Sequence, residues 1–528
     1  MDFTSLAIGL SVGLALAYVV GTLFSSARND GTPPLPPGPK GLPIVGNVND
    51  LPQPGVFEAH HWLKYKDLYG PISSITIMGG TIVIINDARI AIELLEKRSV
   101  KHSSRPRQVF AGEMIGWEHS LALSQYNDRF RTYRKNMSRI IGSKTAAAQF
   151  YDLQDAEVCH FLRHVLDSPE NLVEHIRKAT GAIILKITYG YTAEPHERDP
   201  LIDMAGDAMD KFGIAAVPGA FMVDMFPFLR NLPNWFPGTN FKKTARQWGA
   251  ELTDVIEKPY AFVKHQVAQG KHKTSFLSHL LEAGVPNPEE EFTHKWSSLS
   301  LYTAGADTTV SAVACFFLAM TVYPEVQRKA QEEIDRVVGR DRLPTMADRQ
   351  DLPYVEAVVR EVLRWQPVAP MGLPHTSTAD DVCEGYFIPK GSMVLANVWH
   401  FTHDPAVYHD PLSFKPERFL GPAPEQDPHT FVFGFGRRVC PGRILADNAL
   451  YLNVARSLAV FDVSKPLGED GREVEPVIKM EPGVVSHPAP FRTEIKPRSA
   501  HHENLIRATE ETHPWEESDG KVLESVTY

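Results

Sequence analysis

The sequence contains little cysteine and no excess of basic residues. Four cysteines in 528 residues are too few for a scaffold held by disulfides, and no C-x-x-C pair is present to hold zinc. The cysteine content therefore indicates a reducing compartment, where a functional cysteine would act without a cysteine partner. Acidic residues outnumber basic ones by 64 to 54, for a net charge of −10. This balance argues against a broad basic surface for nucleic acid.

Several common catalytic and cofactor motifs are also missing. The sequence has no G-x-S-x-G, no P-loop and no H-E-x-x-H. Gly434-Phe435-Gly436 begins a dinucleotide-type pattern, but Val439 stands where the third glycine should be. The chain therefore has no recognisable site of its own for NAD or a flavin. In redox chemistry its electrons would come from another protein.

The N-terminus is a long uncharged run. Residues 3–27 carry no charged side chain, and the densest part, residues 6–24, would span about 28 Å as a helix, close to the thickness of a bilayer core. A cleaved signal peptide is the alternative, but the run is too long and Asp2 precedes it. We expect residues 3–27 to form a transmembrane anchor. Arg28 and Lys40 place the following chain on the cytoplasmic side.

Composition then divides the remaining chain into three parts. Five prolines in the seven residues Pro33–Pro39 cannot form a helix, so residues 28–45 are expected to be a stiff, extended hinge. No linker interrupts residues 46–498, which are expected to form one large domain. Residues 499–528 hold seven acidic and two basic residues with almost no periodicity, which predicts a disordered tail.

Apolar spacing predicts a mainly α fold with small β-sheets, an α+β class. Residues 72–86 alternate around Gly79-Gly80 and predict a β-hairpin. Residues 207–238 break into apolar pieces rich in Phe, Met and Pro, which predicts short, irregular helices. Helical spacing occurs over residues 88–98, 127–141, 146–166, 172–188, 292–323, 325–338, 353–365 and 444–460.

The most informative stretch surrounds one cysteine. Cys440 lies between Gly436 and Gly442, which allow the backbone to approach the sulfur closely, and it follows Arg437 and Arg438. Positive charge and the start of a helix after the cysteine both favour the thiolate. An inert, buried thiol is the alternative reading for an isolated cysteine.

This stretch resembles the haem-binding signature of the cytochrome P-450 family, the haem-thiolate monooxygenases. Phe433-x-x-Gly436-x-Arg438-x-Cys440-x-Gly442 matches that signature in full. The resemblance covers residues 35–497 and is greatest to microsomal eukaryotic members, especially those of fungal secondary metabolism. It implies the cytochrome P-450 fold and haem b (iron protoporphyrin IX), with Cys440 as the axial thiolate ligand of the iron.

Further family motifs occur in the expected order. Glu361 and Arg364 form the E-x-x-R motif, and Arg418 lies in the Pro-Glu-Arg-Phe element. By resemblance, these three side chains form a buried structural network. The segment Ala-Gly-Ala-Asp-Thr-Thr at 304–309 matches the oxygen-binding motif, in which Thr308, with Asp307 behind it, would deliver protons. Glycine and threonine also weaken a helix locally.

The resemblance also implies cationic partners for the two haem propionates. Arg438 belongs to the signature itself. Arg134 matches the arginine of the W-x-x-x-R motif, although Phe130 replaces the tryptophan. His375 stands where the family has His or Arg. A solvated surface cation is the alternative for each, above all for His375, because neutral histidine is the weaker partner.

By resemblance the chain is an oxidoreductase that acts on paired donors and inserts one oxygen atom of O₂ into a lipophilic substrate. Hydroxylation or epoxidation in secondary metabolism, such as terpenoid or polyketide tailoring, or in xenobiotic oxidation is expected. The candidate pocket residues Phe110, Met114, Ala304, Met371 and Val485 are all apolar, and core packing is their alternative role. Electrons would come from NADPH through cytochrome P-450 reductase, or from cytochrome b5, at the cytosolic face of the endoplasmic reticulum membrane.

Two other functions remain open. One is a reductase-independent haem-thiolate enzyme that isomerises its substrate or rearranges hydroperoxides. The other is a membrane-anchored haem protein that senses a ligand without turnover. Asp307 and Thr308 argue against both, because proton delivery to dioxygen would be superfluous in either.

Overall fold

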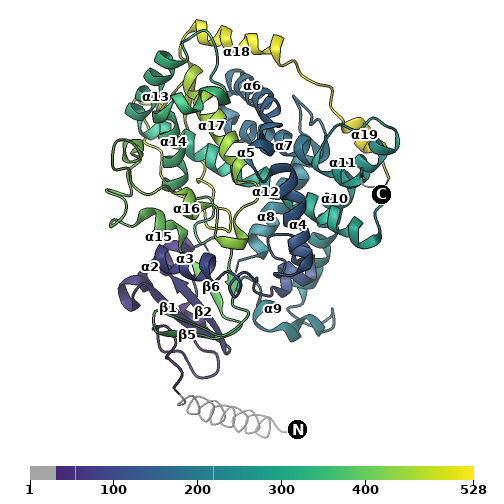
Figure 1. The fold of residues 1–528 in the computed structure, drawn as a ribbon, viewed down its shortest axis with the longest axis vertical. Coiled ribbons are helices and arrows are strands. Elements are labelled where there is room, and N and C mark those ends of the chain that lie inside the picture. The colour runs from purple at the N-terminus through teal and green to yellow at the C-terminus, as the bar shows by residue number, and fades with distance from the viewer. Residues whose placement is uncertain (1–30, 54, 218, 283, 528) are drawn as a thin grey trace. The chain divides into compact units, whose positions relative to one another are not determined.

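The computed structural model describes residues 31–527 apart from 54, 218 and 283. The predicted anchor, residues 3–27, therefore lies outside the described residues. The described chain is mostly helical with small sheets, as expected (Figure 1). It divides into two compact units. The first contains the chain up to Pro106 together with Met371–Phe401 and Phe435–Arg438, and the second contains Arg107–Pro370, Thr402–Gly434 and the chain from Val439 onward.

The first unit is built on a four-stranded sheet of order β1-β2-β6-β3. Strands β1 (Ile72–Ile77) and β2 (Gly80–Ile85) form the predicted antiparallel hairpin. Its turn residues Met78 and Gly79 have φ of 49° and 84°, the left-handed pair that a tight two-residue hairpin requires. The other elements are β3 (His375–Thr376), β4 (Asp381–Cys383), β5 (Tyr386–Ile388), β6 (Met393–Ala396), α2 (Glu58–Tyr69), α3 (Ala88–Ile92) and most of α15 (Val398–His403).

The proline-rich segment is attached to β1 rather than free. The Pro36 carbonyl accepts a hydrogen bond from the Ser74 hydroxyl at 2.6 Å, and the Pro37 carbonyl accepts one from the Ser74 N–H at 2.9 Å. A Cβ at Gly38 would lie 1.8 Å from the Ser74 carbonyl oxygen, so only glycine fits there. The chain from Pro36 onward is therefore fixed to the sheet.

The second unit is almost entirely helical, with one small antiparallel sheet of β7 (Phe461–Ser464) and β8 (Glu494–Pro497). Its longer helices are α4 (Asp128–Ile141), α6 (Tyr151–Asp167), α7 (Leu172–Tyr189), α8 (Pro200–Ala215), α10 (Asn240–Ala268), α12 (Pro288–Val322), α13 (Pro324–Val337), α14 (Pro353–Trp365), α17 (Arg443–Val460) and α18 (Ala500–Thr512). Shorter helices are α5 (Lys144–Ala148), α9 (Met222–Met225), α11 (Phe276–Leu281), α16 (His429–Val432) and α19 (Gly520–Ser525).

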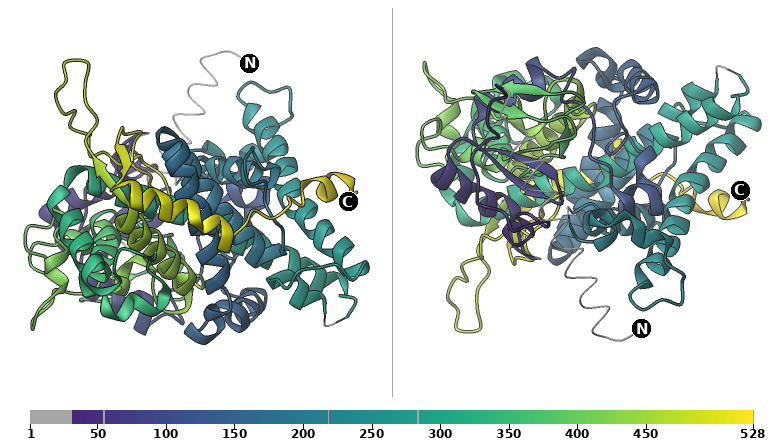
Figure 2. Two further views of the ribbon diagram at one scale, coloured as in Figure 1. Left: turned by 90° about the horizontal axis from the view of Figure 1, so that it is seen from above. Right: turned by 90° about the horizontal axis from the view of Figure 1, so that it is seen from below.

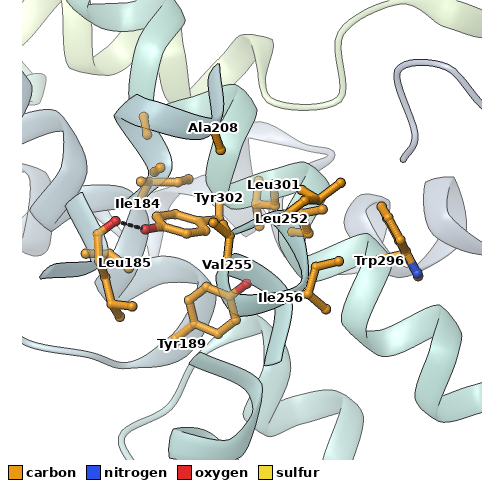
Figure 3. Close-up of a cluster of buried hydrophobic side chains, with 14 of the residues drawn as sticks. Ile184, Leu185, Tyr189, Ala208, Leu252, Val255, Ile256, Trp296, Leu301 and Tyr302 are labelled. Carbon is orange, nitrogen blue, oxygen red and sulfur yellow. Dashed lines mark hydrogen bonds between the residues drawn. The ribbon is translucent and has the colours of Figure 1, made fainter. Parts of the chain in front are cut away.

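Helix α12 forms the centre of this unit and packs against α7, α8, α10 and α17. Figure 3 shows Leu301 and Tyr302 of α12 among apolar side chains of its neighbours, and the Tyr302 hydroxyl donates to the Leu201 carbonyl of α8. Among the described residues, α12 is the one helix long and apolar enough to cross a membrane, but 72% of that apolar window is buried. Because α12 is mostly buried against neighbouring helices, it is a core helix of the folded body.

The structure extends or divides several predicted helices. Helix α12 begins four residues earlier than expected, because Asn287 and Glu290 form a capping box in which each side chain bonds the other's backbone N–H. The predicted helix 146–166 divides into α5 and α6 around Gln149 and Phe150. Helix α10 was not predicted, and it continues through Pro259. The prediction of short, irregular helices over residues 207–238 is wrong for residues 207–215, which belong to the regular helix α8, whereas short helices and turns do follow among the described residues up to 238.

The prediction of a disordered tail is wrong for the described residues 499–527. Helix α18 packs against α6 and α17 (Figure 2), and α19 packs against α10. Between them, the Trp515 ring stacks on His160 with centroids 4.1 Å apart, and Glu516 forms an ion pair with Lys186 at 2.9 Å. Composition did not reveal this order, because a few side chains of a polar segment find specific partners on the folded body.

A buried ionic network joins α14 to the segment that precedes the Cys440 loop. The Glu361 carboxylate accepts two hydrogen bonds from Arg364, both of 2.8 Å, and one of 3.1 Å from Arg418. Glu361 and Arg364 are fully buried. Arg364 also donates to the carbonyls of Thr402, Pro411 and Ser413. The structure thus brings together the three side chains of the predicted network and uses them to hold residues 402–418 in place.

Replacing Glu361 by Gln should lower the stability of the fold by about 3–5 kcal/mol, because two buried guanidinium groups lose their carboxylate. Denaturant unfolding would measure the loss. Glu332→Gln is the matched control, since Glu332 pairs with Arg328 on the exposed surface of α13 and exposed pairs contribute little. Equal stability of the two variants would contradict a stabilising network.

Candidate active site

The Cys440 loop connects α16 to α17 along the chain, and Cys440 itself belongs to the second unit. The Cys440 N–H donates to the Phe433 carbonyl at 2.8 Å, which closes the loop, and a Cβ at Gly442 would lie 4.0 Å from the Cys440 sulfur. The cysteine is half-buried. Helix α17 begins directly behind it at Arg443, as the signature predicts.

The pKa of the Cys440 thiol is shifted in the direction opposite to the one that the sequence predicts. Burial raises this pKa, while a hydrogen bond from the Gly442 backbone and the charges of Arg134 and Arg443 lower it, and the net shift is upward. The sequence predicted a lowered pKa from the neighbouring arginines 437 and 438. That prediction is wrong for the protein alone, because desolvation outweighs the nearby cations. A bound cation such as iron would reverse the balance.

Arg134 contacts the same loop from α4. Its guanidinium donates to the Val439 carbonyl at 2.5 Å, the residue directly before Cys440. Burial lowers the pKa of Arg134, while the charge of Cys440 raises it. Phe130, which replaces the tryptophan of the family motif, is buried one turn earlier on α4. Arg134 therefore contacts the loop of the cysteine, and its role as a propionate partner stays a prediction.

The centre of α12 differs from the rest of this buried helix. Its neighbouring stretches are buried, but Ala304 is exposed and Gly305, Asp307 and Thr308 are partly exposed. The Thr308 hydroxyl donates to the Ala304 carbonyl at 2.8 Å, so threonine does compete for the helix backbone as expected. A Cβ at Gly305 would lie 2.6 Å from Ile184, so this glycine also permits the close packing of α7.

Asp307 has a partner that sequence reasoning did not identify. Its Oδ1 lies 3.1 Å from Nε2 of His487, a residue 180 positions later in the chain. No motif surrounds His487, so only the folded structure reveals the contact. The acid of the predicted proton-delivery pair is therefore held by a histidine.

Cationic side chains gather in the first unit. Arg438 donates to the Ser103 carbonyl at 2.6 Å, and Arg105 donates to the carbonyls of Leu373 and Pro374, both at 2.8 Å. Burial and the charge of Arg438 hold the pKa of Arg105 well below its usual value. Like charges held close and buried in this way favour an anionic partner. Sequence reasoning missed Arg105, because a single arginine in a loop carries no motif.

His375 lies in the same cluster but does not act as a cation there. Its Nδ1 lies 2.6 Å from the His102 carbonyl, to which it can only donate. Burial and the charge of Arg105 hold the His375 pKa well below its usual value. The ring is therefore neutral, and its Nε2 is an acceptor. Because His375 is buried, the alternative of a solvated surface cation does not describe it, and its role beside a propionate stays a prediction.

Gly436 allows the backbone next to Arg438 to lie close to the backbone at Leu95. This glycine has φ of 50°, and a Cβ would lie 2.6 Å from the Leu95 carbonyl oxygen. The signature glycine is thus required by a backbone contact within the first unit.

The apolar residues proposed for the pocket have different surroundings. Phe110 is fully buried and stacks on Phe221 with centroids 3.4 Å apart. Met371 is buried in the core of the first unit. Met114 packs against the core of the second unit, and Val485 is half-buried. Core packing therefore accounts for Phe110 and Met371.

A charged histidine supports the Cys440 loop from α16. His429 contacts Asp427 at 2.6 Å and Asp447 of α17 at 3.0 Å, and its ring stacks on Phe433. Burial lowers the His429 pKa, but the hydrogen bonds to the two carboxylates outweigh it and raise the pKa to about 9. The imidazolium thus ties the start of the loop to the helix that follows it.

The raised pKa of His429 predicts a dependence of stability on pH. Its contribution is fully present below about pH 6.5 and is lost as the pH rises through about 9, with a total of up to about 3 kcal/mol. His429→Gln should flatten the decline of unfolding free energy across this window. His409→Gln, at an exposed histidine, is the control and should keep the decline. An unchanged profile for His429→Gln would refute the assignment.

Comparison with known proteins agrees with this geometry. The family model for cytochrome P-450 matches residues 36–495. The cytochrome P-450 monooxygenase claR of Ampulloclitocybe clavipes is 49% identical over 519 residues, covering 97% of this chain and 95% of that protein. The cytochrome P-450 monooxygenase ppsD of Aspergillus oryzae is 47% identical over 496 residues, covering 93% of this chain and 94% of that protein. O-methylsterigmatocystin oxidoreductase of Aspergillus flavus is 43% identical over 498 residues, covering 93% of this chain and 93% of that protein.

These relatives are fungal enzymes, which confirms the resemblance to fungal secondary-metabolism enzymes that the motifs indicate. The family uses a haem-thiolate iron cofactor, O₂, a small-molecule substrate and a redox partner. The chain therefore belongs to the cytochrome P-450 family and is a monooxygenase, an oxidoreductase that incorporates oxygen from O₂.

Proposed function

We propose that the chain binds haem b and hydroxylates or epoxidises a lipophilic substrate in secondary metabolism, with terpenoids and polyketides as the main candidates and xenobiotics as a further class. The observation that carries this proposal is the accessible centre of α12, where Asp307 and Thr308 remain partly exposed in an otherwise buried helix. A proton-delivering pair has a use there only in the reduction of dioxygen. The printed names of the relatives support the class of pathway.

The donor groups of the chain fit a haem. Cys440 offers a sulfur in a loop closed by the bond of its N–H to the Phe433 carbonyl, and Gly436 and Gly442 belong to the same signature, so Cys440 would be the ligand of the iron. Arg438 and Arg105 are assigned to the propionates, because two neighbouring cations, of which Arg105 is buried, favour anions. Arg134 is assigned to the same role from α4, and neutral His375 would serve as an uncharged neighbour. When bound, the haem supplies activation of O₂, which thiolate ligation favours.

The remaining roles belong to side chains of the second unit. Thr308 would hold a proton at its Oγ1, and Asp307 would supply it. Glu361, Arg364 and Arg418 would hold the backbone before the loop without entering the chemistry. Of the apolar candidates, Met114, Ala304 and Val485 of the second unit would line the substrate pocket, which favours a lipophilic compound.

We also assign residues 3–27 as a single-pass anchor in the endoplasmic reticulum membrane, residues 28–45 as the hinge and residues 46–498 as a cytosolic catalytic domain. Exposed apolar side chains between residues 214 and 236, including Phe228 and Trp235, which is 80% exposed, support contact of the body with a lipid surface. Because no nicotinamide motif occurs in the chain, NADPH–cytochrome P-450 reductase is the proposed electron donor, with cytochrome b5 as an alternative donor.

Turnover with a reductase tests the proposal. The full chain in lipid vesicles, with purified reductase and NADPH, should incorporate ¹⁸O from labelled O₂ into members of a panel of sesquiterpenes, anthraquinones and polyketide aromatics. Omission of NADPH should abolish the product. Product formed without NADPH would instead identify an isomerase or a hydroperoxide-rearranging enzyme, and haem binding without any oxygen insertion would identify a sensor.

Cys440→Ser should remove the thiolate ligand, since a hydroxyl is a far weaker donor to iron. The expected result is loss of the thiolate-type absorption of the reduced carbon monoxide complex. Cys159→Ser and Cys315→Ser are the controls, because both thiols are buried, and burial raises their pKa values, Cys159 to about 11. Survival of the thiolate spectrum in Cys440→Ser would overturn the ligand assignment.

A further inference from the structure

His487 contacts Asp307, and several separate hydrogen bonds hold the backbone of His487 in place. His487 Nε2 lies 3.1 Å from Asp307 Oδ1, and the two side chains are 28% and 14% exposed. This distance is that of an ion pair, and a hydrogen on Nε2 would face the Asp307 side chain, because carboxylate oxygens accept hydrogens. The second ring nitrogen, Nδ1, does not make this contact.

The segment that carries His487 is fixed to α12. The Ser486 carbonyl accepts a hydrogen bond of 2.6 Å from the buried hydroxyl of Ser311, which lies one helical turn after Asp307. The Ser486 N–H donates to the Val368 carbonyl at 2.9 Å. Two anchors directly before His487 therefore hold its backbone beside the turn of α12 that carries Asp307.

The turn containing His487 is itself closed. The Glu481 N–H donates to the His487 carbonyl at 2.8 Å, and the Ser486 hydroxyl donates to the Glu481 carbonyl at 2.8 Å. A Cβ at Gly483 would lie 2.8 Å from the Val485 carbonyl oxygen, so a side chain at this position would disturb the turn. The backbone of His487 is therefore held in place by the turn.

We propose that His487 positions Asp307 and supplies it with protons from solvent. This inference rests on the proposed function, in which Asp307 and Thr308 deliver protons during oxygen reduction. The step transfers the Nε2 proton to Oδ1 of Asp307, while Nδ1 of this partly exposed ring takes a proton from a solvent hydronium ion, which leaves as water. The ring therefore gains one proton and loses one, and Asp307 becomes a carboxylic acid that can donate in turn. His487 is a positioning residue, because it acts through Asp307.

Two substitutions separate the two parts of this role. His487→Gln keeps a polar N–H group within reach of Asp307 but cannot exchange protons, whereas His487→Phe loses the polar contact as well. His501→Gln is a matched control, because His501 of α18 also lies 3.1 Å from an aspartate, Asp341, in an exposed pair that does not contact α12.

The first measurement concerns stability and is independent of turnover. The melting temperatures of wild type, His487→Phe, Asp307→Asn and the double variant form a double-mutant cycle. Because both single variants remove the same contact, the double variant should lose less than the sum of the two. Additive losses would show that the pair makes no contact and would overturn the positioning role.

The second measurement is the hydrogen peroxide released per NADPH consumed by the haem-loaded full chain with reductase, without added substrate. Slow proton supply favours release of peroxide over formation of water. Both His487 variants should therefore raise the peroxide share, and the rate of water formation should fall about 10-fold or more, while His501→Gln behaves as wild type. A wild-type peroxide share in His487→Gln would overturn the proton-supply role. If wild type itself consumes no NADPH, the proposed function fails, and the melting cycle still decides the contact.

Discussion

A fully buried carboxylate, Glu361, is the constraint on which the architecture of the second unit depends. It cannot remain charged without its two arginines, and these arginines donate further to backbone carbonyls between residues 402 and 413. That backbone leads to α16 and the Cys440 loop. One charge at the centre of α14 therefore determines where a stretch of irregular chain lies, which explains how a loop with little secondary structure can hold a sulfur in place.

The remaining supports of the loop reach it from different directions. Arg134 binds the carbonyl before Cys440 from α4, His429 joins α16 to α17, and the Phe433 carbonyl accepts the Cys440 N–H. Each of these three interactions is a hydrogen bond or an ion pair rather than apolar packing. Such bonds hold a ligand orientation more tightly than apolar packing would, because they have preferred lengths and angles.

Sequence reasoning predicted the elements and residues whose chemistry depends on local spacing. The hairpin at 72–85, the helix of Glu361 and Arg364 and the loop of Cys440 all follow from patterns within about ten residues. Arg105, His487 and Trp515 could not be found in this way, because their roles arise from contacts with residues 180 to 355 positions away in the chain. The thiol pKa was mispredicted for a related reason: sequence shows the neighbouring charges but not the burial that opposes them.

The attachment of the proline-rich segment to β1 limits the length of chain between the proposed anchor and the folded body. Pro36, which is bonded to Ser74, lies nine positions after Ala27, the last residue of the proposed anchor. A fully extended chain of that length reaches about 30 Å. A protein held to a bilayer by this anchor would thus keep its β1 strand within that radius of the membrane surface. The body could swivel about the tether, but it could not sample the bulk cytosol, and a hydrophobic compound leaving the bilayer would have a correspondingly short distance to travel.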